Sequence, residues 1–215
     1  LPRPDTQRLL IANDSVYGPL TPIRDIVARM DFAQADVWGA TDSWQHRYHL
    51  QSYFLLAGRR ALDHPAWAAF WNQVRQVSSK DWVISRYEVG LTQALLRGGL
   101  RCRALWRYQN LLDQAIAELT AAEQEGGGRT LIERARMERL ARVCAAYVKR
   151  APVNPTAELW RELLADGYPF IKAELLRTNP ARVPDVAEWQ AVVERFSIAD
   201  TGLVERDLPV GGEGD

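Results

Sequence analysis

The sequence predicts an α/β protein whose second half is mostly helical. Short apolar segments of strand length, bounded by turn-forming residues, recur within the first 60 residues. Further along, apolar residues repeat every three or four positions, which is the spacing of amphipathic helices. Hydrophobic residues make up 47% and charged residues 25% of the 215 residues, as in ordinary folded proteins. This composition excludes an intrinsically disordered or disulfide-scaffold protein.

Short strands and a helix alternate at the start of the chain. Residues 7–12 (QRLLIA) form an apolar run that predicts a short buried strand ending at turn-forming residues, and residues 35–40 (ADVWGA) predict a second strand. Between them, Thr21 and Pro22 favour the start of a helix, because Thr caps helix N-termini and Pro suits their first turn. The aromatic segment 49–57 predicts a third strand.

The short segment between the second and third predicted strands contains Thr41-Asp42-Ser43. We expect these three residues to cap a short turn, since their side chains favour such positions.

Helices are expected after the third strand. The residues spaced at three and four over 67–74 form an aromatic stripe that most simply faces the core. Ser79 is a suitable N-cap for a further helix, which extends to Arg97 and ends at two glycines. Residues 100–105 are predicted to form a last short strand.

The second half predicts helices that serve packing or partner binding. Two amphipathic stripes separated by Gly126-Gly127-Gly128 indicate an antiparallel helical hairpin. Asn154 is expected to cap the next helix, and Asp185 to begin the last one. The predicted segments are a core over 1–107, the hairpin over 108–150, a C-terminal helical segment over 151–200 and a disordered tail over 201–215.

The formal net charge is zero, so the composition does not indicate a nucleic-acid-binding protein. Residues 1–107 carry an excess of five basic side chains and residues 108–215 an excess of five acidic ones. A basic first half suits an anionic ligand. Two cysteines are too few for a disulfide framework, and no segment has the length and apolarity of a membrane span. We therefore expect a cytoplasmic protein.

Asp14 is the first candidate for chemistry. It follows the first predicted strand, and ligands of α/β sheets bind outside the carboxyl ends of strands. A carboxylate there can help to hold Mg²⁺ or Mn²⁺ against diphosphate oxygens. The alternative is an Asx-turn that closes the strand.

Glu88 is the second candidate. Its position in the helix from Ser79 to Arg97 places it within the apolar stripe rather than opposite it. A carboxylate on a half-buried surface keeps its proton to higher pH, which suits a general base near neutral pH. The alternative is an ion pair with a nearby arginine.

Other common sites are not indicated. His46 and His49 are three residues apart, but no third metal ligand is spaced near them. The sequence has no GxSxG, HExxH, P-loop or GxGxxG motif, which excludes the enzyme classes recognised by those motifs.

Six sequence blocks, in the same order, resemble the rhamnan synthesis protein F family, whose members are glycosyltransferase-like proteins of bacterial polysaccharide and lipopolysaccharide assembly. The similar region runs from Leu9 to Pro180. The blocks are LIANDSVYGPL, VWGATDS, HLQSYFLL, RYEVGLTQALL, NPTAELWRELL and PFIKAELLRTNP.

The resemblance implies a GT-A-like nucleotide-sugar transferase fold. In such a fold a Rossmann-like first half holds the nucleotide sugar and a second half presents the acceptor. Family members usually carry a donor-binding part before the Asn-Asp-Ser block, and this chain starts shortly before that block. We therefore expect the helix-rich, acceptor-side half of the fold, with the helical hairpin as an addition.

The resemblance also implies roles for individual residues. Asp14 would stand where many such enzymes carry an Asp-x-Asp metal motif. It would supply one of the two carboxylates of that motif and would hold the divalent cation (Mg or Mn). Glu88 would remove the proton from the acceptor hydroxyl. The acceptor side of the cleft would be lined by Trp38, Gly39, Thr41, Asp42, His49, Gln51 and Ser52.

The expected function is transfer of a deoxysugar, rhamnose, from a nucleotide-diphosphate sugar to a glycan acceptor. The expected place is the inner face of the plasma membrane, in association with membrane-bound polysaccharide assembly proteins. One alternative is a non-catalytic interaction module that docks through the hairpin. Another is a sugar-binding domain that uses its eight tryptophans, although Trp67, Trp71 and Trp82 lie at positions where we expect core burial.

Overall fold

The structure, a computed structural model, describes residues 3–125, 130–197 and 201–208. The chain divides into two compact units. The first contains the residues up to Asn13 and Arg24–Tyr108, and the second contains Asp14–Ile23 and the residues from Gln109 onward. No helix in the described ranges is both long enough and apolar enough to cross a bilayer.

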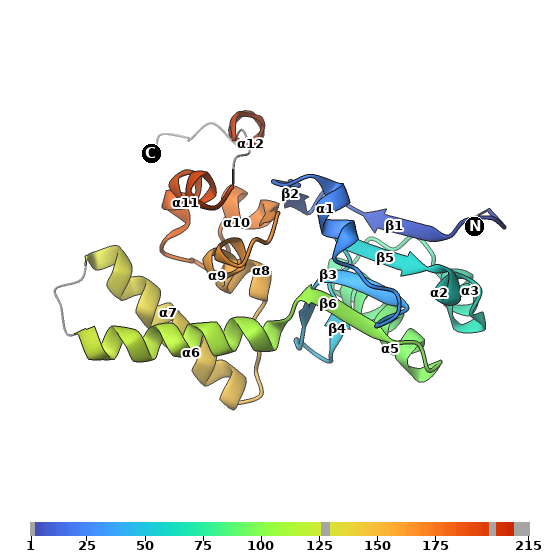
Figure 1. Cartoon of the computed structure of the whole chain (residues 1–215). Coiled ribbons are helices and arrows are strands. Elements are labelled where there is room, and N and C mark those ends of the chain that lie inside the picture. Colours follow the sequence, from blue (N-terminus) through green and yellow to red (C-terminus); the bar gives the residue numbers. More distant parts are fainter. Residues whose placement is uncertain (1–2, 126–129, 198–200, 209–215) are drawn as a thin grey trace. The chain divides into compact units, whose positions relative to one another are not determined.

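A mixed sheet forms the centre of the first unit (Figure 1). Strands β1 and β5 are antiparallel, β5 and β3 are antiparallel, and β6 is parallel to β3. The short strand β4 pairs with the last two residues of β3. The strands are β1 (Arg8–Ala12), β3 (Val37–Ser43), β4 (His49–Leu50), β5 (Phe54–Gly58) and β6 (Cys102–Trp106).

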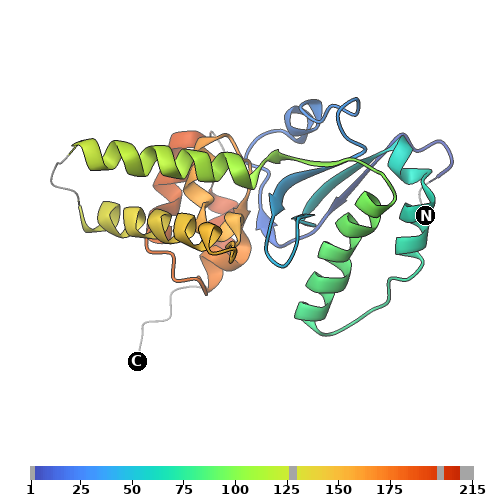
Figure 2. The same ribbon diagram turned by 90° about the horizontal axis from the view of Figure 1, so that it is seen from below.

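Helices lie on both faces of this sheet (Figure 2). An apolar cluster joins the sheet residues Val37, Leu55 and Ala104 to Trp67 and Leu95 of the helices on one face. The opposite face meets the segment that contains α1. The helices are α1 (Ile23–Ala28), α2 (Arg59–Leu62), α3 (Pro65–Trp71), α4 (Lys80–Val83), the π-helix η1 (Ile84–Val89) and α5 (Gly90–Arg97). The α/β class predicted from the sequence is confirmed.

Three details of the first unit differ from the sequence-based predictions. Residues 7–12 were expected to form a buried strand, but β1 lies at the sheet edge and alternates exposed with half-buried residues. Thr41-Asp42-Ser43 belong to β3, because β4 and β6 on either side of β3 extend that strand through Ser43. Of the expected turn caps, Ser43 does cap the segment that follows, since its Oγ accepts the Gln45 N–H at 3.1 Å. The predicted strand 49–57 is two strands, since residues 51–53 leave the ladder.

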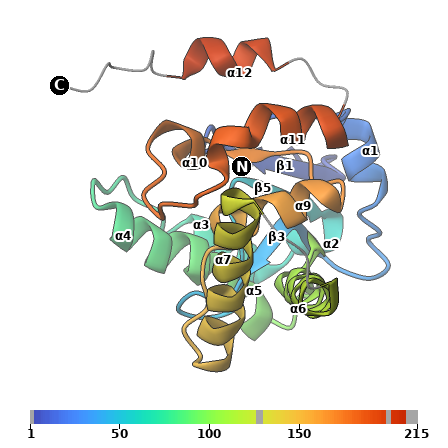
Figure 3. The same cartoon turned by 90° about the vertical axis from the view of Figure 1, so that its left-hand side faces the viewer.

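The second unit combines a small antiparallel ribbon with helices. Strands β2 (Val16–Tyr17) and β7 (Ile171–Lys172), which the sequence did not reveal, pair with each other. Helices α9 and α11 lie near one end of α7 (Figure 3), and Glu162 of α9 pairs with Arg136 of α7. The helices are α6 (Tyr108–Glu125), α7 (Leu131–Val148), α8 (Pro155–Glu158), α9 (Trp160–Ala165), α10 (Ala173–Arg177), the 3₁₀ helix η2 (Val186–Glu188), α11 (Trp189–Phe196) and α12 (Gly202–Asp207).

The predicted helical hairpin is present as α6 and α7. The two helices are antiparallel, because Arg136 pairs with Glu118 and the Tyr147 hydroxyl donates to Gln109. Thr130 begins α7 with a capping box that includes Glu133. The three glycines expected to join the helices lie outside the described residues.

The predicted segment boundaries differ from the observed units in two ways. Asp14–Ile23 joins the second unit, and the hairpin shares that unit with the C-terminal helices. The tail predicted to be disordered from residue 201 begins with α12, which buries Val204 against the core of the second unit. Residues 209–215 lie outside the described residues.

Candidate functional site

Several predicted site residues lie at one edge of the sheet in the first unit. Strands β1, β3 and β6 run in the same direction, since β1 and β3 are both antiparallel to β5 and β6 is parallel to β3. Their carboxyl ends therefore meet at one edge, which is where α/β sheets usually bind ligands. The residues at these ends are Asn13, Thr41–Ser43 and Arg107–Tyr108.

A bulge interrupts the strand beside β3 at this edge. Gly39 pairs with Leu55, and the Gln51 N–H donates to the Thr41 carbonyl at 3.0 Å. Between these points β3 has one residue, Ala40, whereas the neighbouring strand has three, residues 52–54. The neighbouring strand therefore accommodates two extra residues. Bulges of this kind are common beside functional sites because they redirect side chains.

Glu88 holds this bulge in place. Its Oε1 accepts a hydrogen bond from the Ser52 N–H at 3.0 Å, and its side chain is half-buried. Within the described residues Glu88 makes no ion pair with an arginine, which was the alternative, and its Oε2 has no hydrogen-bond donor. Glu88 lies in η1, and π-helical turns are frequent at functional sites. One hydrogen bond thus joins two irregular backbone features.

Buried polar side chains support the bulge from the strand beside it. The Thr41 hydroxyl lies 2.7 Å from Gln51 Oε1 and 2.6 Å from the Tyr53 hydroxyl. The Asn13 N–H donates to the Tyr53 carbonyl at 3.2 Å, so the end of β1 is attached to the bulge as well. The structure therefore brings together four of the predicted residues, namely Thr41, Gln51, Ser52 and Glu88.

Asp42 is buried at the end of β3. Its Oδ1 accepts the Tyr108 N–H at 2.6 Å, which satisfies a free donor at the start of α6. Burial raises the pKa of the Asp42 carboxyl, while the Tyr108 hydrogen bond and the nearby Arg107 charge oppose that rise. Asp42 thus connects the ends of β3 and β6.

Replacing Asp42 by asparagine is expected to change the pH dependence of stability. The pKa of Asp42 is higher in the folded than in the unfolded chain, so the folded state loses stability as pH rises above 3.8 and through the raised value. Asn retains an oxygen for the Tyr108 N–H but does not titrate. Urea unfolding across this pH range should show the wild type losing stability relative to D42N. A difference between the two proteins that does not change with pH would contradict the raised pKa.

Three other residues expected to line the acceptor side serve packing in this structure. The Trp38 indole is 5% exposed and donates to the Asp31 carbonyl at 3.1 Å. A side chain at Gly39 would come within 3.1 Å of Leu50, so the glycine permits close packing of β3 against β4. His49 is buried, and its Nδ1 lies 2.8 Å from the Arg47 carbonyl oxygen.

Asp14 belongs to the second unit, whereas Glu88 belongs to the first. The Asp14 side chain is exposed and forms no hydrogen bond within the described residues, so the Asx-turn is not formed. No group of three or more His, Cys, Asp or Glu side chains in the described ranges has a metal-binding arrangement. The chain by itself therefore does not provide a formed cation site at Asp14, and metal binding there stays a prediction.

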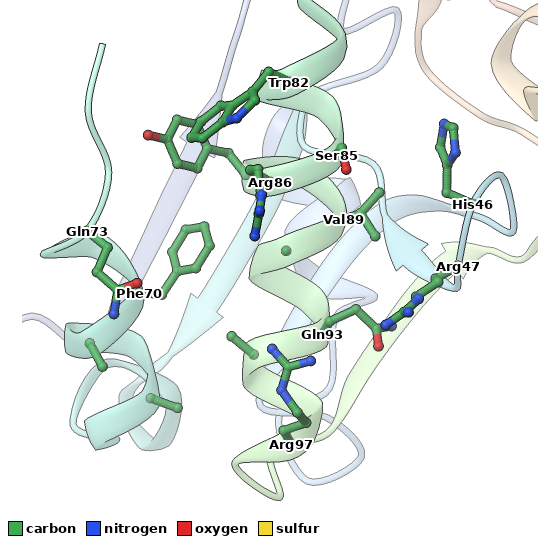
Figure 4. A pocket seen from close by; sticks show the side chains of 15 residues that line it. His46, Arg47, Phe70, Gln73, Trp82, Ser85, Arg86, Val89, Gln93 and Arg97 are labelled. Atoms are coloured by element: carbon green, nitrogen blue, oxygen red, sulfur yellow. The ribbon is translucent and has the colours of Figure 1, made fainter. Parts of the chain in front are cut away.

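The sequence analysis missed a cavity of about 790 Å³ between α3 and the continuous run of η1 and α5 (Figure 4). Arg86 and Arg97 project from that helical run, and Arg47 comes from the loop after β3. Trp82 was expected in the core but is 41% exposed, because it belongs to the cavity wall. The prediction of core burial is correct for Trp67, which is 3% exposed.

The structure is that of a mixed α/β protein with polar side chains at the carboxyl edge of its sheet. Comparison with known sequences shows its family. The profile described as rhamnan synthesis protein F matches residues 5–123, more than half of the chain. The chain belongs to this family, which connects it with polysaccharide synthesis at the family level. No solved structure matches it significantly.

Two curated relatives are similar to the chain. It is 30% identical over 181 residues to the virulence protein VirA of Vibrio anguillarum, covering 83% of this chain and 55% of that protein. It is 26% identical over 108 residues to the uncharacterized protein y4gN of Sinorhizobium fredii, covering 48% of this chain and 28% of that protein. The chain thus spans about half or less of the length of these relatives.

Proposed function

We propose that the chain is the acceptor-side half of a GT-A-like glycosyltransferase that builds a bacterial surface polysaccharide or lipopolysaccharide. The donor would be a nucleotide-diphosphate sugar, with rhamnose as the transferred sugar, and the acceptor a growing glycan. Such an enzyme would act at the inner membrane face beside membrane-bound assembly proteins. The family supports polysaccharide synthesis, and the Glu88 geometry supports catalysis.

The observation that carries the proposal is the Glu88 carboxylate at the bulge. One oxygen is fixed by the Ser52 N–H, which orients the group, and the other oxygen has no donor within the described residues. A general base needs this combination of a fixed position and an available lone pair. The neighbouring network of Thr41, Gln51 and Tyr53 keeps the backbone of the bulge in position.

The proposed reaction is a single displacement with inversion. The acceptor hydroxyl oxygen forms a bond to the anomeric carbon as the bond from that carbon to the diphosphate oxygen breaks. The hydroxyl proton passes to Glu88, and the nucleoside diphosphate leaves with the electron pair of the broken bond. In this proposal Glu88 acts as the general base, and the residues of the bulge position it.

A transfer assay tests this function. The longest expressible form of the protein that contains this chain is incubated with a panel of nucleotide sugars and a glycan acceptor, and the elongated product is measured. We expect transfer from one or a few donors, with nucleotide-rhamnose among them. A titration with a chelator in the same assay tests whether transfer depends on a divalent cation.

Absence of transfer with every donor, from a folded protein that still binds its assembly partners, would contradict the glycosyltransferase. That result would favour the non-catalytic interaction module instead.

A further inference from the structure

We propose that the cavity between α3 and the run of η1 and α5 binds a phosphorylated sugar. The phosphate would be held by Arg86, which lies one helical turn after Trp82, and the sugar ring would lie against Trp82. Arg47 and Arg97 add positive charge further along the cavity. Glu88 is not among the lining residues of this cavity, and its carboxylate contacts Ser52. The cavity is therefore a second site, distinct in its residues from the bulge.

The charge of the cavity selects an anion. Three guanidinium groups line it, and none of its lining residues carries a carboxylate. Within the described part of the chain, none of these three arginines forms an ion pair with an acidic residue. Guanidinium groups bind phosphate through paired hydrogen bonds, and a concave surface of one sign of charge concentrates anions.

The aromatic wall of the cavity suits a ring. Trp82 packs edge-on against Tyr87 with ring centroids 5.0 Å apart, and Tyr87 packs in the same way against Phe70 at 6.3 Å. Because Trp82 is 41% exposed, part of its indole surface is available to the apolar face of a sugar. Gln73 and Ser85 on the lining offer hydrogen-bond partners for sugar hydroxyls.

The wall is also fixed before any ligand arrives. The Tyr87 hydroxyl accepts the Arg75 N–H at 2.7 Å and donates to the Arg75 carbonyl at 2.9 Å. The Gln93 amide donates to the Tyr48 carbonyl at 2.8 Å, which ties α5 to the segment that carries Arg47. A site that is already ordered loses less entropy on binding. Its volume of about 790 Å³ is that of a small-molecule site.

The phosphate part of this inference rests on the cavity alone, whereas the sugar part rests on the proposed function. Two ligands carry a phosphorylated sugar of this kind. One is the sugar diphosphate of a nucleotide sugar, and the other is a phosphate-bearing sugar of the glycan acceptor.

Calorimetric titration of the whole chain tests the inference, with hexose 1-phosphate, the same hexose without phosphate and inorganic phosphate as probes. We expect hexose 1-phosphate to bind at least about 10-fold more tightly than the neutral hexose. Arg86→Ala should weaken its binding by about 10-fold or more, as expected for loss of a charge-assisted hydrogen bond. Trp82→Ala should weaken hexose 1-phosphate binding and leave inorganic phosphate binding unchanged.

Arg24→Ala is the matched control. Arg24 belongs to the same unit, and its side chain is 85% exposed. The variant removes the same charge outside the cavity and should bind like the wild type. The melting temperature of each variant shows whether it is folded. Competition by a nucleoside diphosphate would identify the donor as the source of the phosphate, and lack of competition would identify the acceptor.

Equal binding of hexose 1-phosphate by the wild type and by the Arg86 variant would overturn the inference. Equal binding of the phosphorylated and neutral hexoses would do so too. Failure of the proposed function has a separate readout, which is the absence of sugar transfer with every donor in the transfer assay.

Discussion

Replacing Glu88 by glutamine is expected to lower the turnover of the full-length protein by about 10²- to 10⁴-fold, which is the usual contribution of a general base. The amide cannot accept the proton of the acceptor hydroxyl. Glutamine retains an oxygen that can accept the Ser52 N–H, so the bulge should keep its conformation. We therefore expect a large fall in kcat with little change in KM for the acceptor, measured by steady-state transfer assays.

A matched control is Asp81→Asn. Asp81 is exposed in α4, directly before η1, and its substitution also replaces a carboxylate by an amide. We expect turnover close to that of the wild type. If Glu88→Gln and Asp81→Asn have the same turnover, Glu88 is a structural residue of the bulge and not the base.

Replacing Arg139 by alanine is expected to lower the free energy of unfolding by about 3–5 kcal/mol, the usual cost of breaking a buried ion pair. Arg139 is 0% exposed in α7. One of its guanidinium nitrogens lies 3.5 Å from Asp185 and 3.7 Å from Glu162, which are both buried. Among the described residues, its loss leaves those carboxylates with the half-buried Arg161 and Arg136 as cationic partners.

Chemical denaturation of the whole chain measures this effect, which should appear in the transition of the second unit. Arg134→Ala on the exposed side of α7 is the control, because surface substitutions usually change stability by less than about 0.5 kcal/mol. Equal stability of the Arg139 and Arg134 variants would mean that the network makes no net contribution. The network attaches the hairpin to α9 and to the segment before α11.

The candidate site was only partly predictable from the sequence. The helical spacing around Glu88 correctly indicates a half-buried carboxylate, because burial of one helix face follows from local periodicity. The spacing does not indicate that Ser52 is its partner. That contact depends on the bulge. The bulge forms because the strand beside β3 has two more residues than β3 between the points where the two strands pair.

The cavity was beyond sequence analysis for a similar reason. Arg47, Arg86 and Arg97 occur at separate places in the chain, and their positions match no motif. Trp82 has the spacing of a core residue, but its environment depends on how α3 packs beside η1.

The sequence by itself determined the local elements, namely most strands and helices, their caps at Ser79 and Asn154, and the helical hairpin. These elements follow from periodicity, capping and turn chemistry, which act over a few residues. Only the tertiary structure decided the edge position of β1, the division of residues 49–57, the β2 and β7 ribbon and the cationic cavity. Each of these depends on contacts between distant segments, and the free energy of such contacts is not encoded in any local pattern.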